Sequence, residues 1–235
     1  MQLILLASGR GSRLKKLTQN TPKCLIKVRS KPIIEYISEN FKKFNETIIL
    51  TGYKSELIKK KFPKIKKIRN NEYKSTNMVY SLFCARKHIT QDIIVSYSDI
   101  IFDHYIINKM INFNKSHIPL NKEWLSLWKR RMSEKKINND AENLLIDKKK
   151  VISIGSKIKN SRPNLQFMGL VKLKYKDFIK LYKFFISLKN PKIDMTSFLD
   201  IAIKKKKISL RYFKTSRYWF EIDTVKDKKI VEKFL

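Results

Sequence analysis

The sequence has little of what stabilises small secreted proteins or anchors a chain in a membrane. Among 235 residues there are two cysteines, Cys24 and Cys84, and their spacing matches no zinc-binding signature. Two thiols are too few for a disulfide framework, which excludes a disulfide-stapled secreted module. No stretch approaches the roughly 18 to 20 apolar residues of a membrane-spanning helix, and residues 3–7 are too short a run for a signal peptide. We therefore expect a cytoplasmic protein without a transmembrane segment.

Glycine, proline and acidic residues are also scarce. Five glycines and six prolines argue against long unstructured linkers. The 53 Lys+Arg against 20 Asp+Glu give a net charge of +33. A strongly positive net charge is common in proteins that bind nucleic acid, where the basic residues cluster on one face. Here the lysine runs at 59–61, 148–150 and 204–207 are spread along the chain. We interpret the charge as a solvated basic surface that attracts anionic substrates, with no specific nucleic acid; a nucleic-acid site is the alternative.

The order of the predicted elements indicates an α/β fold. In the first hundred residues, short apolar runs alternate with segments of helical spacing. The expected strands are 2–7, 47–51, 65–68 and 92–97, and the expected helices are 32–44, 55–61 and 78–87. This alternation predicts a Rossmann-like, mostly parallel sheet sandwiched by helices. The second half is expected to add a small antiparallel extension or lid. Its predicted strands are 123–128, 142–147, 151–154 and 166–173, and its predicted helices are 175–188, 195–203 and 224–234.

The strongest local motif directly follows the first predicted strand. Residues 6–13 are Leu-Ala-Ser-Gly-Arg-Gly-Ser-Arg. Ligands of open α/β sheets bind at the carboxyl ends of the strands, where glycines let backbone N–H groups close around phosphate oxygens. Arg13 and Lys23 would supply cations for a polyphosphate. The motif is not a P-loop, and Leu14 at the third glycine position excludes a dinucleotide fingerprint; a tight turn with incidental basic residues is the alternative.

Gly-x-Gly-x-Arg followed by Pro-Lys resembles the nucleoside-triphosphate transferases that act on sugar 1-phosphates and phosphorylated head groups. The signature of that family is close to Leu-Ala-Ala-Gly-x-Gly-Ser/Thr-Arg-Leu, and here Ser8 replaces the second alanine. The resemblance implies that Arg13 and Lys23 hold the triphosphate and the transition state. It also implies that residues 7–11 face the nucleotide.

Two aspartates extend the resemblance. Asp99 follows Ser98 at the end of the fourth predicted strand, where the family has Gly-Asp. Asp223 ends Trp-Phe-Glu-Ile-Asp, which resembles the family's Trp-x-Glu-Ile-Asp. Nucleotidyl transfer needs Mg²⁺, which is usually held by one or two carboxylates, phosphate oxygens and water. The resemblance implies that Asp99 and Asp223 are these ligands; the alternative is that each caps a helix.

The middle of the chain narrows the resemblance. Residues 76–82 (Thr-Asn-Met-Val-Tyr-Ser-Leu) resemble a segment of bacterial phosphocholine-type cytidylyltransferases, and ordered matches continue to about residue 225. The resemblance implies transfer of CMP from CTP to a small phosphorylated or phosphonylated head group, with release of pyrophosphate. Phosphocholine, aminoethylphosphonate or a phosphoglutamine-like molecule would be the acceptor, for decoration of a surface polysaccharide or lipid. The nucleotide would be bound by Leu6, Ala7, Ser8, Gly9, Arg10, Gly11, Ser12, Arg13, Lys23, Gly52, Thr76, Asn77, Ser81 and Ser98.

The resemblance covers one domain, residues 1–235, with a nucleotide-binding half at 1–118 and an acceptor-binding or lid half at 119–235. Tryptophans and a carboxylate would suit a quaternary ammonium of the acceptor. Arg131 and Lys157 would instead bind a second anionic group of the acceptor, and Glu142 would pair with an acceptor amine. The acceptor candidates are Trp128, Arg131, Glu142, Lys157, Trp219 and Glu221. Core packing is the alternative for the tryptophans.

Catalysis would come from positioning and charge neutralisation, so no catalytic histidine is required. His88, His104 and His117 lie in no motif and are expected to be partly exposed. Two other functions stay open. One is a sugar-1-phosphate nucleotidyltransferase that uses UTP or dTTP. The other is a non-catalytic basic protein that binds RNA or a membrane surface. We expect a monomer or a homodimer.

Overall fold

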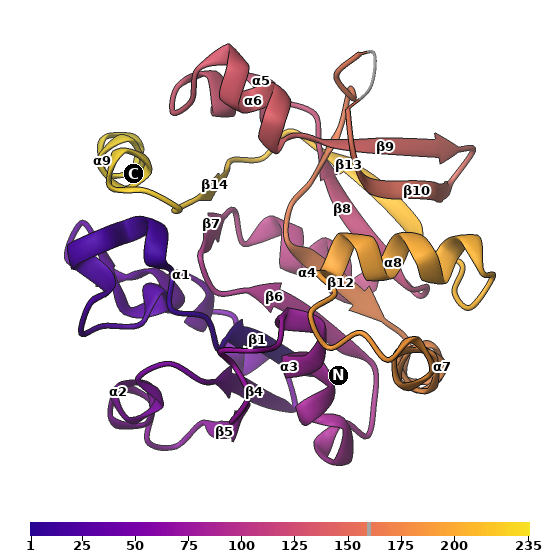
Figure 1. The fold of residues 1–235 in the computed structure, drawn as a ribbon, viewed down its shortest axis with the longest axis horizontal. Helices are drawn as coiled ribbons and strands as arrows, with labels where there is room; N and C mark the ends of the chain where they lie inside the picture. The colour runs from indigo at the N-terminus through magenta and orange to yellow at the C-terminus, as the bar shows by residue number, and fades with distance from the viewer. Residues whose placement is uncertain (159–160) are drawn as a thin grey trace.

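Strand β1 (Gln2–Ala7) lies inside the main sheet, as its unbroken apolar sequence requires. In the computed structural model, which describes residues 1–158 and 161–235, β1 pairs in parallel with β4 (Glu46–Thr51) and with β6 (Ile93–Tyr97). Strand β5 (Lys66–Arg69) continues the parallel part beyond β4. The four strands expected in the first half are therefore present, and the α/β fold is confirmed (Figure 1).

The second half extends the same sheet instead of forming a separate one. Its strands are β8 (His117–Asn121), β9 (Glu142–Asp147), β10 (Lys150–Lys157), β11 (Gln166–Phe167), β12 (Leu170–Leu173) and β13 (Arg211–Thr215). The strand order is β5-β4-β1-β6-β12-β8-β13-β10-β9, with β11 beside β8. Strand β12 is antiparallel to β6, and β9 and β10 form an antiparallel hairpin at the far edge. The expected antiparallel extension is this part of the sheet.

Helices cover both faces of the sheet, because alternate residues of each strand face opposite sides. Leu3 and Leu5 of β1 belong to one core cluster and Ile4 to the other. The first cluster is covered by α1 (Ile33–Ser38), α2 (Ser55–Lys61), α4 (Tyr105–Asn112), α5 (Trp124–Lys129), α6 (Glu134–Asp140) and α9 (Val225–Phe234). The second is covered by α3 (Met78–Cys84), α7 (Tyr175–Leu188) and α8 (Met195–Lys204). Across the described residues, no helix is both long and apolar enough to cross a membrane.

The strand expected at 123–128 is wrong, because these residues form helix α5. Trp124, Leu127 and Trp128 follow the helical spacing of i, i+3 and i+4, and all three are buried. The Trp128 ring meets that of Trp124 edge-on, with ring centroids 5.3 Å apart. The apolar residues of this segment follow the helical period, so the strand predicted from alternating apolar and polar residues was wrong.

Other expected elements are interrupted. The helix expected at 32–44 ends at Ser38 and is followed by a separate 3-10 turn at Phe41–Lys43. The strand expected at 166–173 divides into β11 and β12 at Gly169, whose φ is +76°. His117 is buried in β8, contrary to the exposure expected for it, with its ring centroid 4.5 Å from that of Phe113.

A separate two-stranded ribbon pairs a segment near the C-terminus with the residues that follow β6. Strand β14 (Trp219–Glu221) pairs antiparallel with β7 (Ile100–Phe102), and Glu221 lies opposite Ile100. The N–H of Ile222 donates to the carbonyl of Asp99 at 3.0 Å. This pairing places Asp223 beside Asp99, although the two are far apart in sequence. A second ribbon joins β2 (Lys27–Val28) to β3 (Lys31–Pro32), shortly after Lys23.

Candidate active site

A cavity of about 210 Å³ lies at the carboxyl ends of β1 and β6. This is the edge where open α/β sheets bind their ligands. The lining residues are Leu6, Ala7, Ser8, Gly9, Gly11, Lys23, Cys24, Tyr73, Thr76, Asn77, Met78, Ser81, Tyr97, Ser98 and Asp99. We call it the nucleotide cavity, because it contains most of the residues predicted to bind the nucleotide.

Gly11 lets the first loop turn against Lys23. Its φ is +75°, in the left-handed region that favours glycine. A Cβ at this position would also lie 2.6 Å from the Cβ of Lys23. The hydroxyl of Thr18 donates to the carbonyl of Gly11 at 3.0 Å and fixes the end of the loop. The second glycine of the motif is therefore required both by backbone conformation and by the approach of Lys23.

Hydrogen bonds join the loop to the neighbouring strands. The Ser8 hydroxyl donates to Leu50 at the end of β4, and the Ser98 hydroxyl donates to Leu6 at 2.6 Å. Gly52 does not line the cavity. It allows the close approach of this loop, because a Cβ there would lie 2.6 Å from the carbonyl oxygen of Ser8 and 2.7 Å from Tyr73.

The opposite wall is the segment that precedes and begins α3. Asn70, which is 1% exposed, donates to the hydroxyls of Thr76 and Ser81 at 2.9 Å each. The Asn77 side chain caps α3 by accepting from the N–H of Met78. Because these polar groups bind one another, the segment forms a preorganised wall of the cavity.

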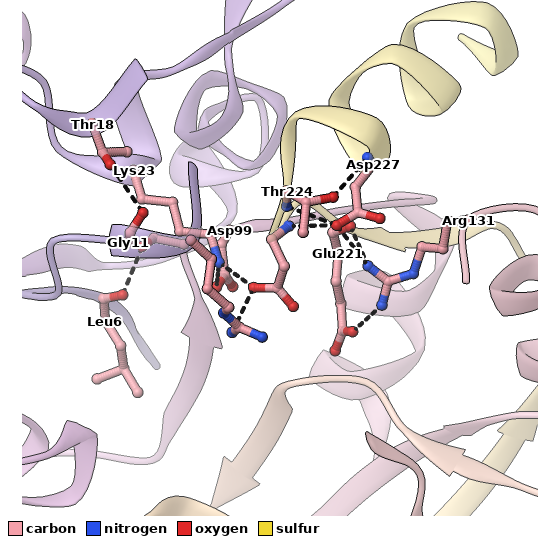
Figure 2. Close-up of polar contacts among 12 residues, drawn as sticks. Leu6, Gly11, Thr18, Lys23, Asp99, Arg131, Glu221, Thr224 and Asp227 are labelled. Carbon is pink, nitrogen blue, oxygen red and sulfur yellow. Dashed lines mark hydrogen bonds and ion pairs between the residues drawn. The ribbon is translucent and has the colours of Figure 1, made fainter. Parts of the chain in front are cut away.

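Four charged side chains meet beside this cavity (Figure 2). The ammonium of Lys23 lies 2.5 Å from a carboxylate oxygen of Asp99 and 2.6 Å from one of Asp223. The guanidinium of Arg13 lies 2.9 Å from the same oxygen of Asp223. The structure thus brings together all four residues predicted to be catalytic.

The same contacts shift the pKa values of Lys23 and Asp223. Burial acts to lower the pKa of Lys23, but Asp99 and Asp223 outweigh it and raise that pKa above its ordinary value. Burial acts to raise the pKa of Asp223, and the charges of Lys23 and Arg13 reverse that effect and lower it. Lys23 and Asp223 are therefore both charged at neutral pH.

The two aspartates fit a divalent cation. Their oxygens converge on one positive position, which the ammonium of Lys23 holds. Among the described residues, no three His, Cys, Asp or Glu side chains gather as a self-sufficient metal site. Two carboxylates completed by phosphate oxygens and water are what Mg²⁺ commonly uses at nucleotide sites.

Neither aspartate caps a helix. Asp99 precedes strand β7, not a helix. The N-cap of α9 is Thr224, whose hydroxyl accepts from the N–H of Asp227, while Asp227 accepts from the N–H of Thr224. Asp227 also accepts from the N–H of Asp223 at 3.1 Å. The capping alternative is therefore wrong for both residues, and the cap itself fixes the backbone of Asp223.

A second cavity, of about 250 Å³, adjoins the charged cluster. Its lining residues are Arg13, Tyr97, Trp128, Arg131, Asp140, Glu142, Gln166, Phe167, Gly169, Glu221 and Asp223. Tyr97 lines both cavities, and the ion pair of Lys23 with Asp223 joins them. We call it the acceptor cavity, because its lining includes four of the residues predicted to bind the acceptor: Trp128, Arg131, Glu142 and Glu221.

Arg131 forms ion pairs with carboxylates of the protein itself. It is 6% exposed and lies 2.6 Å from Glu221 and 3.4 Å from Asp227 (Figure 2). It also donates to the carbonyl of Glu221 at 2.8 Å. Burial, together with Asp223 and Asp99, raises the pKa of Glu221 to about 7 against the opposing charge of Arg131. Arg131 thus organises the wall of the cavity.

Several predicted residues lie outside both cavities. Lys157 is exposed on β10, and Trp219 is 1% exposed in the core, where its ring centroid lies 6.3 Å from that of Trp128. Core packing, the alternative stated for the tryptophans, holds for Trp219. Arg10 and Ser12 are exposed, and the guanidinium of Arg10 lies over the ring of Tyr53.

Sequence reasoning missed other residues at the site. Tyr73, Tyr97 and Gln166 line the cavities without belonging to a motif. Asp140 also lines the second cavity; it belongs to the matched segment Asp-Ala-Glu that ends at Glu142, but it was not predicted to bind a substrate. Asp227 was open to detection, since Thr224 followed three positions later by an acidic residue resembles a capping box. Its contact with Arg131 depends on tertiary structure and had no local signal.

Comparison with known proteins agrees with this geometry. Residues 3–119 match the family described as MobA-like NTP transferase domain. The CTP:phosphoglutamine cytidylyltransferase of Campylobacter jejuni subsp. jejuni serotype O:2 is 32% identical, over 98% of this chain and 98% of that protein. The choline-phosphate cytidylyltransferase of Streptococcus pneumoniae is 33% identical over 47% of this chain and 50% of that protein. The inositol-1-phosphate CTP transferase from T. maritima has a TM-score of 0.79 at 18% identity, covering 99% of this chain and 95% of that one, which shows the fold alone.

The fold and the site together define a nucleotidyltransferase, as the motifs of the first loop predicted. The chain belongs to the family that includes the Campylobacter CTP:phosphoglutamine cytidylyltransferase, with which it aligns over nearly its whole length.

Proposed function

We propose that the enzyme transfers CMP from CTP to a small phosphorylated or phosphonylated head group. The observation that carries this proposal is the position of Lys23, Asp99, Asp223 and Arg13 where the two cavities meet. A nucleotide bound on one side and an acceptor bound on the other would present their reacting groups to this cluster. The names of the relatives support CTP and a phosphorylated acceptor.

In the nucleotide cavity, the backbone of the first loop would surround the phosphates. Gly9 and Gly11 leave that backbone open, and the cations of Lys23 and Arg13 would bind phosphate oxygens. The cytosine would contact the wall that contains Thr76 and Ser81. Each group would thus be held in a fixed position before reaction.

The reaction is an in-line displacement at the α-phosphorus of CTP. A phosphate or phosphonate oxygen of the acceptor forms the new bond to phosphorus as the bond to the pyrophosphate oxygen breaks. That attacking oxygen is already anionic at neutral pH, so no general base is needed, and no histidine is among the described residues that line either cavity. Lys23 and Arg13 would neutralise charge on the triphosphate as pyrophosphate leaves.

Asp99 and Asp223 would hold the Mg²⁺ that the family implies. When bound, this ion supplies additional neutralisation of the phosphate charge. The product would be an activated head group, ready for transfer to a surface polysaccharide or lipid.

Pyrophosphate release tests the proposal directly. We would measure it with Mg²⁺ and each of CTP, UTP, ATP and dTTP, against phosphocholine, aminoethylphosphonate, phosphoglutamine and glucose 1-phosphate. We expect turnover with CTP and a head group. Turnover only with the sugar phosphate and UTP or dTTP would replace the proposal by a sugar nucleotidyltransferase. A protein that binds none of the nucleotides would contradict the proposal.

The net charge of +33 favours a second candidate, binding of RNA or an anionic membrane surface. Counterion release makes such binding weaken steeply as salt rises. Turnover of CTP at a closed site should depend on salt far less. Strong binding of RNA together with absence of nucleotide turnover would favour this second candidate.

A further inference from the structure

The acceptor cavity is acidic in a protein that is strongly basic. Its lining contains four carboxylates, Asp140, Glu142, Glu221 and Asp223, against the two guanidinium groups of Arg13 and Arg131. Both guanidinium groups are paired with carboxylates, Arg13 with Asp223 and Arg131 with Glu221. Among the described residues, neither Asp140 nor Glu142 has a cationic partner, so acidic side chains outnumber basic ones in this cavity.

Glu142 shares one hydrogen-bond donor with a second carboxylate. The hydroxyl of Thr196 lies 2.8 Å from Glu142 and 3.0 Å from Asp194, and its single hydrogen serves one of them at a time. Asp194 has other donors, because it accepts from the backbone N–H and the hydroxyl of Ser197 at the start of α8. Of these two carboxylates, Glu142 therefore has more unused acceptor capacity, and it lines the cavity.

Gln166 on β11 provides an independent sign of a missing ligand. The residue is 4% exposed and lines the same cavity. Its buried side-chain oxygen Oε1 has no hydrogen-bond partner among the described residues. A buried carbonyl oxygen without a donor is costly, and a ligand that donates a hydrogen bond removes that cost.

The aromatic residues of this cavity do not form an open cage for a methylated ammonium. The ring of Trp128 is 5% exposed, and the guanidinium of Arg131 lies 5.3 Å from its centroid. Phe167 is 7% exposed and is packed edge-on against Tyr97. A quaternary ammonium, which has no N–H to donate, would also leave Gln166 unsatisfied.

We propose that Glu142 and Gln166 form a binding site for a primary ammonium group, so that the acceptor carries –NH₃⁺ at the end opposite its reacting phosphate or phosphonate. This inference rests on the proposed function and sharpens it, since it separates amine-bearing acceptors from choline-type ones. The ammonium donates to the carboxylate of Glu142 and to Oε1 of Gln166. Its positive charge suits a cavity in which acidic side chains outnumber basic ones.

Matched acceptor pairs test this specificity. The pairs are phosphoethanolamine with phosphocholine, aminoethylphosphonate with its N-trimethyl derivative, and phosphoglutamine with its N-acetyl derivative. We would measure kcat/KM for pyrophosphate release with CTP and Mg²⁺. In each pair that is used, the –NH₃⁺ member should be preferred by about tenfold or more, the effect of one charge-assisted hydrogen bond to a buried acceptor. Equal use of the two members, or preference for the member without –NH₃⁺, would overturn the inference.

Substitutions assign the preference to these residues. Glu142→Gln keeps the size of the side chain and an acceptor for Thr196 but removes the charge, and Gln166→Met removes the oxygen. Both should reduce the preference to about twofold or less, with the affinity for CTP unchanged. The matched control is Glu134→Gln on α6, which removes a carboxylate that is paired with Arg162 at the surface, outside the cavity.

The remaining outcomes separate the two proposals. If Glu142→Gln does not fold, as judged by thermal melting, Gln166→Met still decides the assignment. Either variant, folded and with the wild-type preference, would contradict it. Binding of CTP without turnover of any of the six acceptors would overturn the ammonium site and leave the nucleotide site intact. Absence of CTP binding would overturn the proposed function itself.

Discussion

The two cavities are built in different ways. The nucleotide cavity is lined by residues 6–9 and Gly11, at the end of a central strand and in the loop that follows it, with one wall from the start of α3. The acceptor cavity is lined by single side chains from α5, β9, β11 and β14, elements that are far apart in sequence. The difference shows which kind of site a sequence motif can encode. A backbone cradle needs particular residues in a row, whereas a cavity of converging side chains needs the fold.

In both cavities, the balance of acidic and basic residues also differs from that of the whole chain. The nucleotide cavity contains one lysine and one aspartate, which are paired with each other. The acceptor cavity contains four acidic and two basic residues, although the chain has 53 basic residues and 20 acidic ones. The net charge therefore describes the surface and does not describe the site.

The largest effect should come from the cluster that joins the two cavities. Asp99→Asn removes a carboxylate beside Lys23 and one of the two groups proposed to hold Mg²⁺. We expect kcat to fall about 10³-fold, the scale found when a group that stabilises transition-state charge is removed. Steady-state release of pyrophosphate measures this effect.

The control for Asp99→Asn is Asp147→Asn. Asp147 is an exposed aspartate at the end of β9, outside both cavities. This variant should keep the wild-type kcat. Wild-type turnover in Asp99→Asn would show that neither the metal nor the transition state depends on this carboxylate.

The same contrast explains how much the sequence predicted. Around β1, the apolar run, the glycine loop and the crossover helices give independent local signals, and the four strands of the first half were predicted correctly. The structure places Lys23 in the nucleotide cavity and Arg13 in the acceptor cavity, beside Asp223. Asp99 and Asp223 were paired only through family motifs. Their proximity depends on the pairing of β7 with β14, two three-residue strands whose length is too short for a periodic signal.

The larger errors lie in the second half, where packing decides which element forms. Residues 123–128 contain two tryptophans, which are compatible with either a strand or a helix, and burial against β14 selects the helix. Lys157 and Trp219 were assigned to the acceptor by residue type and by their place in family motifs. The strand register instead exposes the lysine and buries the tryptophan. No sequence motif marked Gln166, because this residue stands out only in the folded state, where its buried side-chain oxygen has no hydrogen-bond partner among the described residues.

The second largest effect concerns His117, which is buried at the start of β8 and lines neither cavity. Burial lowers the pKa of His117 to about 4, and Lys172 adds to this effect. The proton therefore binds more tightly to the unfolded chain, whose histidine has a pKa of about 6.5. Stability should be complete above pH 6.5, should fall as the pH drops towards 4, and should change no further through this residue below 4. The full loss is about 3 kcal/mol.

Urea unfolding at pH 7, 5.5 and 4.5 measures this loss. The control is His117→Asn, which keeps a side-chain N–H near the position of Nδ1, the atom that lies 2.7 Å from the carbonyl of Lys115. The variant should start less stable and lose less stability between pH 7 and 4.5 than the wild type. Parallel losses in the two proteins would assign the pH dependence to other groups.

A smaller effect should come from Asp227, which links the acceptor side to the charged cluster. It accepts from the N–H groups of Asp223 and Thr224 and contacts Arg131. Asp227→Asn weakens these contacts without removing any group that would touch a substrate. We expect kcat to fall about tenfold and the KM for CTP to stay within about twofold, with about 1 kcal/mol of stability lost with the cap.

The control for Asp227 is Asp177→Asn. Asp177 lies in the first turn of α7 and accepts a hydrogen bond from Ser116 at 2.5 Å, far from the cavities. It should lose similar stability and keep kcat. An equal fall of kcat in the two variants would reduce Asp227 to a helix-capping residue, and Asp227→Glu should restore part of kcat if the carboxylate positions Asp223.

The smallest effect should come from the lysines that dominate the composition. Lys205 and Lys206 are exposed after α8 and line neither cavity. Salt screens charges beyond about 8 Å at physiological ionic strength. In the double variant Lys205→Gln, Lys206→Gln, kcat/KM should therefore change less than about twofold.

The control is Lys23→Gln, which removes one charge of the same type where two carboxylates meet. It should reduce kcat by orders of magnitude. If the surface pair changed turnover as much as Lys23 does, at 150 mM salt, the basic surface would be part of the site. If the pair instead weakened only binding of RNA, its charge would act on polyanions independently of catalysis.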